Sequence, residues 1–146
     1  MNKNGFLLAE ETLKIIIAVI AIGFLVYFLV SLYFSTQSSA ELNQAKSTLP
    51  SITSAISKGE TSVDVYNPKG WVIDTWPHGS EIPDSCTNLG LKSCICICPS
   101  DTKTKCDNGG TCADNSGFLI KGDSIAITNP PITLNIDKTT KIISQK

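Results

Sequence analysis

The apolar stretch from Ile15 to Phe34 is the feature that most constrains the fold of this chain. It contains no Asp, Glu, Lys or Arg. An α-helix of about 20 residues is about 30 Å long, which matches the hydrocarbon thickness of a bilayer. The stretch ends in bulky residues, Leu32-Tyr33-Phe34, where a secretory signal would carry small residues before its cleavage site. We therefore expect the helix to remain attached to the polar sequence that follows it.

The distribution of positive charge predicts the orientation of this helix. Lys3 and Lys14 lie before the apolar block, and the next basic residue is Lys46. Basic residues favour the cytoplasmic side of a membrane, so we expect a cytoplasmic N-terminus and an extracellular head. The formal net charge of -1 provides no basic surface. Nucleic acid is therefore not expected as a partner.

The residues in front of the apolar block form a recognisable pattern. A basic residue, a small residue, a bulky apolar residue and a carboxylate follow one another as Lys3, Gly5, Phe6 and Glu10. This N-terminus resembles that of type IV pilin-like proteins, over residues 1–35 and not in the head. The resemblance implies that a leader peptidase removes residues 1–5 after Gly5, so that Phe6 becomes the first mature residue.

Glu10 lies where the pilin-like family carries its glutamate. The resemblance implies that Glu10 pairs with the Phe6 amino group of a neighbouring subunit and sets the register between subunits. A carboxylate in apolar surroundings costs a few kcal/mol unless it is paired. A local alternative is that Glu10 and Glu11 favour the helix N-terminus and that Glu10 pairs with Lys14 one turn later. The two interpretations are compatible.

The helix is expected to cover residues 6–58, with an apolar part at 15–34 and an amphipathic part at 35–58. The amphipathic part begins with a polar collar at 35–39. Apolar residues then recur every three or four positions, which predicts one buried stripe made of Leu42, Ala45, Leu49, Ile52 and Ile56. Pro50 lies in this stripe and is expected to bend or interrupt the helix near Leu49. Gly59 is the expected stop signal, and a flexible hinge is the alternative use of this stretch.

The head, residues 61–146, changes to a period of two. Strands are predicted at 62–66 and 71–76, separated by a turn at 67–70, and again at 132–136 and 141–143. Gly122-Asp123 predicts a two-residue hairpin between 118–121 and 124–128. The expected fold class is α+β, with a long N-terminal apolar helix followed by a small antiparallel β-sheet head and a disulfide-rich loop region. We expect a meander of about four strands with one face against the amphipathic helix.

The aromatic residues of the head are candidate core residues. Tyr66, Trp71 and Trp76 are expected in the core or against the stalk. A carbohydrate-stacking surface is the alternative, because exposed aromatic residues mark binding sites. His78, the only histidine, lies between Pro77 and Gly79 and is expected to be a surface loop residue.

The cysteines are confined to one part of the head. All six fall between positions 86 and 112, at Cys86, Cys94, Cys96, Cys98, Cys106 and Cys112. In a small extracellular domain an even number of cysteines predicts disulfides. Alternation places the sulfurs of residues 94, 96 and 98 on one face of a strand, where neighbours are poorly placed to bond each other. Each of these three is therefore expected to pair with one of the other three cysteines, which leaves six connectivities open. The disulfides are expected to hold loops at 99–105 and 107–111.

Metal binding is the alternative interpretation of the cysteine cluster. CxCxC with further cysteines can surround zinc or an iron–sulfur cluster, but the paired CxxC spacing of common zinc modules is missing. Asp107 to Gly110 and Asp114 to Gly117 have residue types that suggest calcium, but neither run fits a known calcium-loop spacing and turn chemistry explains both better. No metal and no cofactor are therefore expected.

The sequence contains no arrangement of residues that is typical of catalysis. A nucleophile with a histidine base, a phosphate loop and a carboxylate pair are all missing. We therefore expect a non-enzymatic structural subunit of a type IV pilus-like surface filament. Its expected partners are further copies of itself in a helical homopolymer, the membrane before assembly, and the leader peptidase and assembly machinery. The alternatives are a monomeric, single-span, membrane-anchored extracellular binding domain and a metal or redox module on the cysteines.

Overall fold

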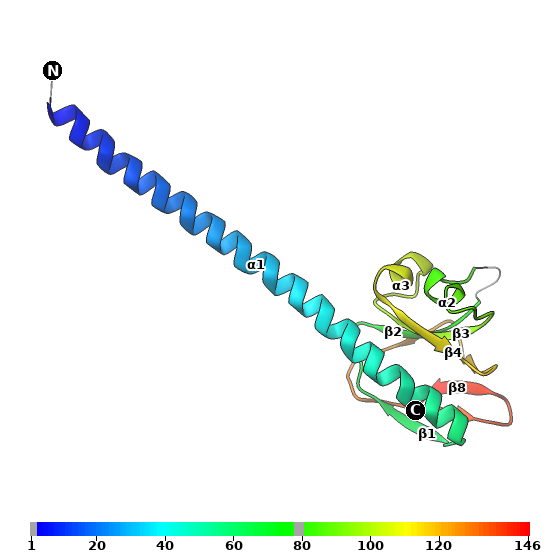
Figure 1. Ribbon diagram of the computed structural model, residues 1–146. Coiled ribbons are helices and arrows are strands. Elements are labelled where there is room, and N and C mark those ends of the chain that lie inside the picture. Colours follow the sequence, from blue (N-terminus) through cyan, green and yellow to red (C-terminus); the bar gives the residue numbers. More distant parts are fainter. Residues whose placement is uncertain (1–2, 78–80) are drawn as a thin grey trace. The chain divides into compact units, whose positions relative to one another are not determined.

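The computed structural model describes the backbone of residues 3–77 and 81–146. It describes the side chains of residues 11–77 and 81–146. His78 lies outside the described residues. The chain divides into two units, Met1–Ser39 and Ala40–Lys146. Helix α1 (Lys3–Lys58) begins in the first unit and ends in the second (Figure 1). The end of α1 therefore belongs to the compact head.

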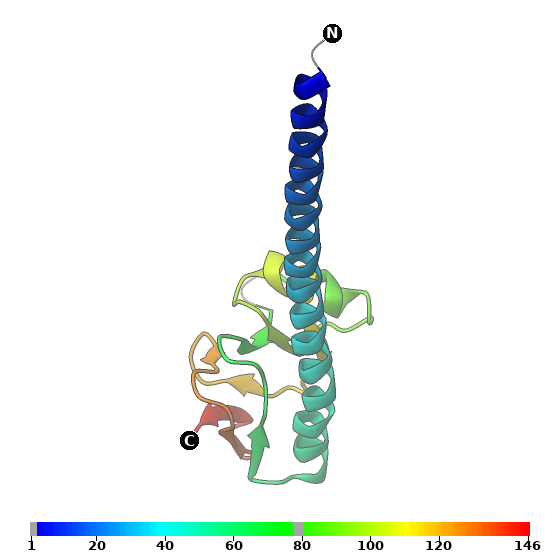
Figure 2. The ribbon, with the colours of Figure 1, turned by 90° about the vertical axis from the view of Figure 1, so that its left-hand side faces the viewer.

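Helix α1 ends where the glycine signal predicts. Gly59 has a positive φ of 73°, a conformation that glycine adopts without steric cost. Its N–H donates to the Ile56 carbonyl at 3.2 Å, and the Glu60 N–H donates to the Ala55 carbonyl at 2.9 Å. These bonds satisfy carbonyls that the helix end would leave unpaired. Figure 2 shows the chain reversing after this turn and running back as β1 (Ser62–Val65).

Pro50 does not interrupt α1, so the expected interruption is wrong. The helix is continuous to Lys58 with Pro50 inside it. The Thr53 hydroxyl lies 3.4 Å from the Leu49 carbonyl and 3.2 Å from the Pro50 carbonyl. A proline removes one backbone hydrogen bond, whereas tertiary packing provides most of the stability of a helix. Here Leu49 and Ile52 are buried on either side of the proline, and this packing keeps the helix continuous through Pro50.

The head is built on two four-stranded sheets, which confirms the α+β class. In the first sheet the order is β1, β7 (Ile132–Asp137), β8 (Ile142–Gln145) and β5 (Leu119–Ile120). In the second sheet the order is β4 (Thr111–Asp114), β3 (Cys94–Cys98), β2 (Val72–Trp76) and β6 (Ile125–Ala126). Two short helices, α2 (Asp84–Thr87) and α3 (Lys103–Gly109), complete the head. The single four-stranded meander is therefore wrong.

The predicted hairpin across Gly122-Asp123 is also wrong. Strand β5 pairs in parallel with β8, so that Leu119 lies opposite Ile142, and β6 pairs with β2. The Ile120 N–H donates to the Thr75 hydroxyl at 3.1 Å. Gly122-Asp123 therefore predicts a turn but not which strands pair. Strands β5 and β6 lie at the edges of different sheets, and each places one isoleucine in the shared core.

The main core lies between the amphipathic end of α1 and the two sheets. The predicted helix stripe is confirmed, because four of its residues are buried and Leu42 packs partly buried against them. Strand β3 contributes Ile95 and Ile97 to this core, both fully buried. The intervening Cys94, Cys96 and Cys98 point to the opposite face and join a second cluster. The alternation of β3 therefore separates an aliphatic layer from a sulfur layer.

The tryptophans are core residues, as predicted, but Tyr66 is not. Trp71 is 6% exposed and Trp76 is 3% exposed, whereas Tyr66 is 58% exposed. The Trp71 indole N–H donates to a carboxylate oxygen of Glu41 on α1 at 3.3 Å. Buried rings cannot present a stacking face to a sugar, so the carbohydrate platform on the two tryptophans is wrong.

Candidate functional site

The N-terminal unit presents an apolar helix surface on every side. The large apolar side chains between Leu13 and Phe34 are each 49–72% exposed. By length and composition, α1 can cross a membrane. A helix that is apolar all round is stable only in a membrane or among other apolar helices. We call this surface, residues 13–34, the assembly surface.

The polar collar after the assembly surface remains helical. The Thr36 hydroxyl donates to the Leu32 carbonyl at 2.9 Å, and the Ser39 hydroxyl donates to the Ser35 carbonyl at 3.1 Å. Hydroxyls that bond back to the preceding turn satisfy their own hydrogen-bonding needs without leaving the helix. The collar therefore marks a change from apolar to polar surroundings inside one continuous helix.

The residues implied by the pilin resemblance lie at the start of α1. Gly5, Phe6 and Glu10 all fall within its helical backbone. Their side chains lie outside the described ones. Cleavage after Gly5 and the register role of Glu10 therefore stay predictions.

The six cysteines form three disulfides. They join Cys86 to Cys94, Cys96 to Cys112 and Cys98 to Cys106, with Cα–Cα distances of 6.2, 4.1 and 4.8 Å. Each bond connects one cysteine of β3 to a different element, namely α2, β4 and α3. This is one of the six connectivities that the alternation of the strand leaves open.

The disulfides themselves form the core beneath α2 and α3. All six cysteines are at most 9% exposed, and among the described residues their cluster otherwise contains Trp76 and three partly buried apolar residues. Gly110 permits this packing, because a Cβ there would lie 2.9 Å from the sulfurs of Cys98 and Cys106. The stretches expected to be loops include α3, so that part of the prediction is wrong. The half-cystine at Cys106 anchors this helix from within.

An ion-pair network joins α2 to α3 on the outside of the sulfur layer. The Lys103 ammonium lies 2.9 Å from Asp84 and 3.0 Å from Asp107. Asp107 also accepts a hydrogen bond from the Ser85 N–H at 3.1 Å. The hydrogen bonds to Asp84 and Asp107 raise the pKa of Lys103. Partial burial alone would raise the pKa of Asp107, but hydrogen bonds from Lys103 and Ser85 outweigh it and lower the pKa.

Replacing Asp107 by Asn is expected to speed amide hydrogen exchange in α2, because the ion pair and a strong acceptor for Ser85 are lost. In the unmodified chain the Asp107 contribution is present above the ordinary carboxyl pKa of 3.8. It disappears as the pH falls through the lowered native pKa. Exchange measured by mass spectrometry on the α2 peptide, corrected for the intrinsic rate at each pH, checks both effects. Asp101→Asn is the control, because the Asp101 carboxylate accepts a hydrogen bond from the Ser100 hydroxyl next to it in the chain. Equal exchange in the two variants would contradict the prediction.

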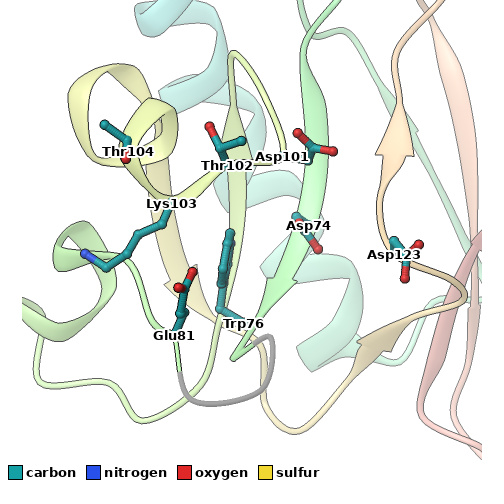
Figure 3. A pocket seen from close by; sticks show the side chains of 8 residues that line it. All are labelled: Asp74, Trp76, Glu81, Asp101, Thr102, Lys103, Thr104 and Asp123. Atoms are coloured by element: carbon teal, nitrogen blue, oxygen red, sulfur yellow. The ribbon is translucent and has the colours of Figure 1, made fainter.

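The head contains a pocket of about 530 Å³, and Figure 3 shows the side chains that line it. Its lining combines carboxylates, two hydroxyls, a lysine and an indole, from Asp74, Trp76, Glu81, Asp101, Thr102, Lys103, Thr104 and Asp123. Strand β2 contributes Asp74 and Trp76, and Asp123 comes from the turn before β6. Asp74 is 1% exposed and accepts a hydrogen bond from the Thr75 N–H at 2.7 Å. The Lys103 ammonium is directed to the network between α2 and α3.

The pocket is not predictable from sequence, because its lining residues are spread over 50 positions, from 74 to 123. The carboxylates give it a negative character that attracts cations in general. Open groups of carboxylates are common on protein surfaces, and the described lining contains no feature that selects one ligand. The pocket therefore carries no functional assignment.

Comparison of the chain with models of protein families, with curated proteins and with solved structures finds no match in any of the three.

Proposed function

We propose that this protein is the structural subunit of a type IV pilus-like filament on the cell surface. The observation that carries the proposal is the exposed apolar surface of residues 13–34, on a helix whose other end is part of the core of the head. Buried apolar area stabilises association by roughly 25 cal/mol per Å². Once the helices leave the membrane, packing them side by side keeps the apolar surface out of water and leaves the disulfide-stapled heads outside.

The assembly follows from the division of α1 into two parts. The amphipathic part buries Ala45, Leu49 and Ile52 within the head, so its apolar stripe is not available to another subunit. The apolar part has no such partner within its own described unit. In the proposed cycle it resides in the membrane before assembly, is processed after Gly5, and then joins the core of the filament. Glu10 fixes the register by pairing with the Phe6 amine of a neighbour.

The first experiment is to determine the N-terminal residue and intact mass of the chain from sheared surface material, together with electron microscopy of the same sample. Filaments composed of chains that begin at Phe6 support the proposal. Chains that begin at Met1 or Asn2 in assembled material would remove the amine that Glu10 is proposed to pair with. A protein found only in the membrane fraction, with no filaments, would favour a single-span anchored domain.

Replacing Glu10 by Gln is expected to give fewer and shorter filaments, because the neutral amide cannot pair with the Phe6 ammonium as a carboxylate does. Glu11→Gln removes the same charge one position away and is expected to leave filament number and length close to those of the unmodified chain. Filament length distributions from electron micrographs check the difference. Equal loss in both variants would indicate that only the general charge of the helix N-terminus matters.

A further inference from the structure

The first sheet exposes apolar side chains on both of its sides. Strand β1 forms one edge, β8 and β5 lie at the other, and β7 lies between them. Tyr66, which directly follows β1, is 58% exposed. On the other side, Leu119 and Ile142 lie opposite each other in β5 and β8 and are 55% and 36% exposed. Because all three side chains stay exposed, they do not cover one another within a single head.

Ile142 borders a pocket of about 280 Å³ on the outer face of this sheet. In the β7–β8 ladder Asn135 pairs with Ser144 and Asp137 pairs with Ile142, and these four residues line the pocket together with Lys121 and Thr140. The volume lies just below the roughly 300–1,000 Å³ of small-molecule sites, and it suits a single large side chain. An apolar wall with polar groups around it fits a tyrosine, whose ring is apolar and whose hydroxyl is polar.

The charges beside the two apolar features are of opposite sign. Side chains alternate along a strand, so Asp64 and Tyr66 share the exposed face of β1, while Val65 between them is buried. On the other side, the exposed Lys141 directly precedes Ile142. Strands β1 and β8 run in the same direction, because each is antiparallel to β7. Two heads placed side by side in the same orientation therefore bring Asp64 of one to Lys141 of the other when Tyr66 meets Ile142.

We propose that Tyr66 of one subunit docks into the pocket beside Ile142 of the next subunit, with Asp64 paired to Lys141. This inference rests on the proposed filament function. The contact is heterologous, because it joins two different surfaces of the same chain, and such contacts form open helical assemblies when their rotation does not close a ring. The Thr133 hydroxyl donates to Asp64 at 2.7 Å and holds the carboxylate on the outer face. The heads thus fix the position of neighbouring subunits in addition to the apolar helices.

Charge reversal tests the contact by loss and rescue. Asp64→Lys and Lys141→Asp are each expected to lower the number of surface filaments about ten-fold, because like charges then face each other across the contact. The chain that carries both substitutions is expected to restore the number of filaments. Asp64→Lys combined with Lys105→Asp, at an exposed lysine on α3, restores the net charge but not the contact and is expected to remain depleted. Filaments are counted by electron microscopy of sheared surface material from cells with equal amounts of the protein.

Photocrosslinking in assembled filaments locates the contact directly. A photoreactive phenylalanine derivative at position 66 is expected to give dimers on a denaturing gel, with the adduct on peptides of the other chain that contain Leu119 or Ile142. The same derivative at position 89, where Leu89 is 59% exposed, is expected to give no adduct on these peptides.

The outcomes separate this contact from the filament itself. If the unmodified chain forms filaments, then an adduct elsewhere on the chain, normal assembly of both single charge variants, or failure of the double variant to restore assembly would each overturn the Tyr66 contact and leave the filament proposal standing. Absence of filaments from the unmodified chain would overturn both.

Discussion

A chain carrying Leu25→Lys is expected to leave the membrane fraction, whereas a chain carrying Leu89→Lys is expected to remain in it. Leu25 lies within the assembly surface and is 57% exposed, and Leu89 lies in the head and is 59% exposed. The two substitutions are therefore matched in residue type, exposure and added charge. A lysine near the centre of a membrane helix costs about 2.5–3.5 kcal/mol on insertion scales, and a lysine on a polar head costs almost nothing.

Fractionation with an alkaline wash measures this difference, and surface filaments are expected to be lost from the Leu25→Lys cells as well. Alkylation of the oxidised chains followed by intact mass shows whether all three disulfides have formed and thus whether the head has folded. A Leu25→Lys chain that has a correctly bonded head and still resists the alkaline wash would contradict a membrane or filament role for the assembly surface.

Removing the Cys96–Cys112 disulfide with paired serine substitutions is expected to lower the free energy of unfolding of the oxidised head by about 3 kcal/mol. This bond joins directly opposed residues of β3 and β4 and has a sequence separation of 16. Removing Cys86–Cys94, which has a separation of 8, is expected to cost about half a kcal/mol less on the same loop-entropy argument. The difference is small because loop entropy grows only with the logarithm of loop length.

Guanidinium unfolding of the oxidised full chain in detergent, followed by tryptophan fluorescence, measures these free energies. Trp76 lies in the sulfur cluster and Trp71 lies in the aliphatic core, so fluorescence reports on both layers. An unchanged free energy after loss of Cys96–Cys112 would mean that α2, α3 and β4 do not depend on the bridge. It would contradict the view that disulfides take the place of a core in this layer.

The parts of the fold with a strong local periodicity were predictable from sequence. Alternation at Cys94 to Cys98 indicated a strand with sulfur on one face, and the structure has that strand with isoleucines on the other face. The helix stripe and the Gly59 stop were predictable for the same reason. The alternation of apolar and polar side chains and the conformational freedom of glycine depend on residues close together in the chain. Both can therefore be recognised in a short stretch of sequence.

The pairing of the short strands was not predictable, because it depends on residues far apart in the sequence. Gly122-Asp123 has the composition of a hairpin turn, yet β5 pairs with β8 and β6 pairs with β2. Only the positions of the two sheets decide which edge is available to Ile120 and to Ile125. The pocket around Asp74 was missed for the same reason. Its lining residues come together only after β2, α3 and the turn before β6 have packed.

The place where the head begins has a consequence for preparing it in soluble form. The compact unit starts at Ala40, within α1, and not at the first strand. A fragment cut at Thr61 would expose the inner faces of the sheets that Leu49, Ile52 and Ile56 cover, and it would aggregate. A protease that cleaved in the polar collar at 35–39 would instead release the compact unit with the end of α1 still packed on its sheets. Cleavage at the collar would thus separate a diffusible, folded head from the apolar part of α1.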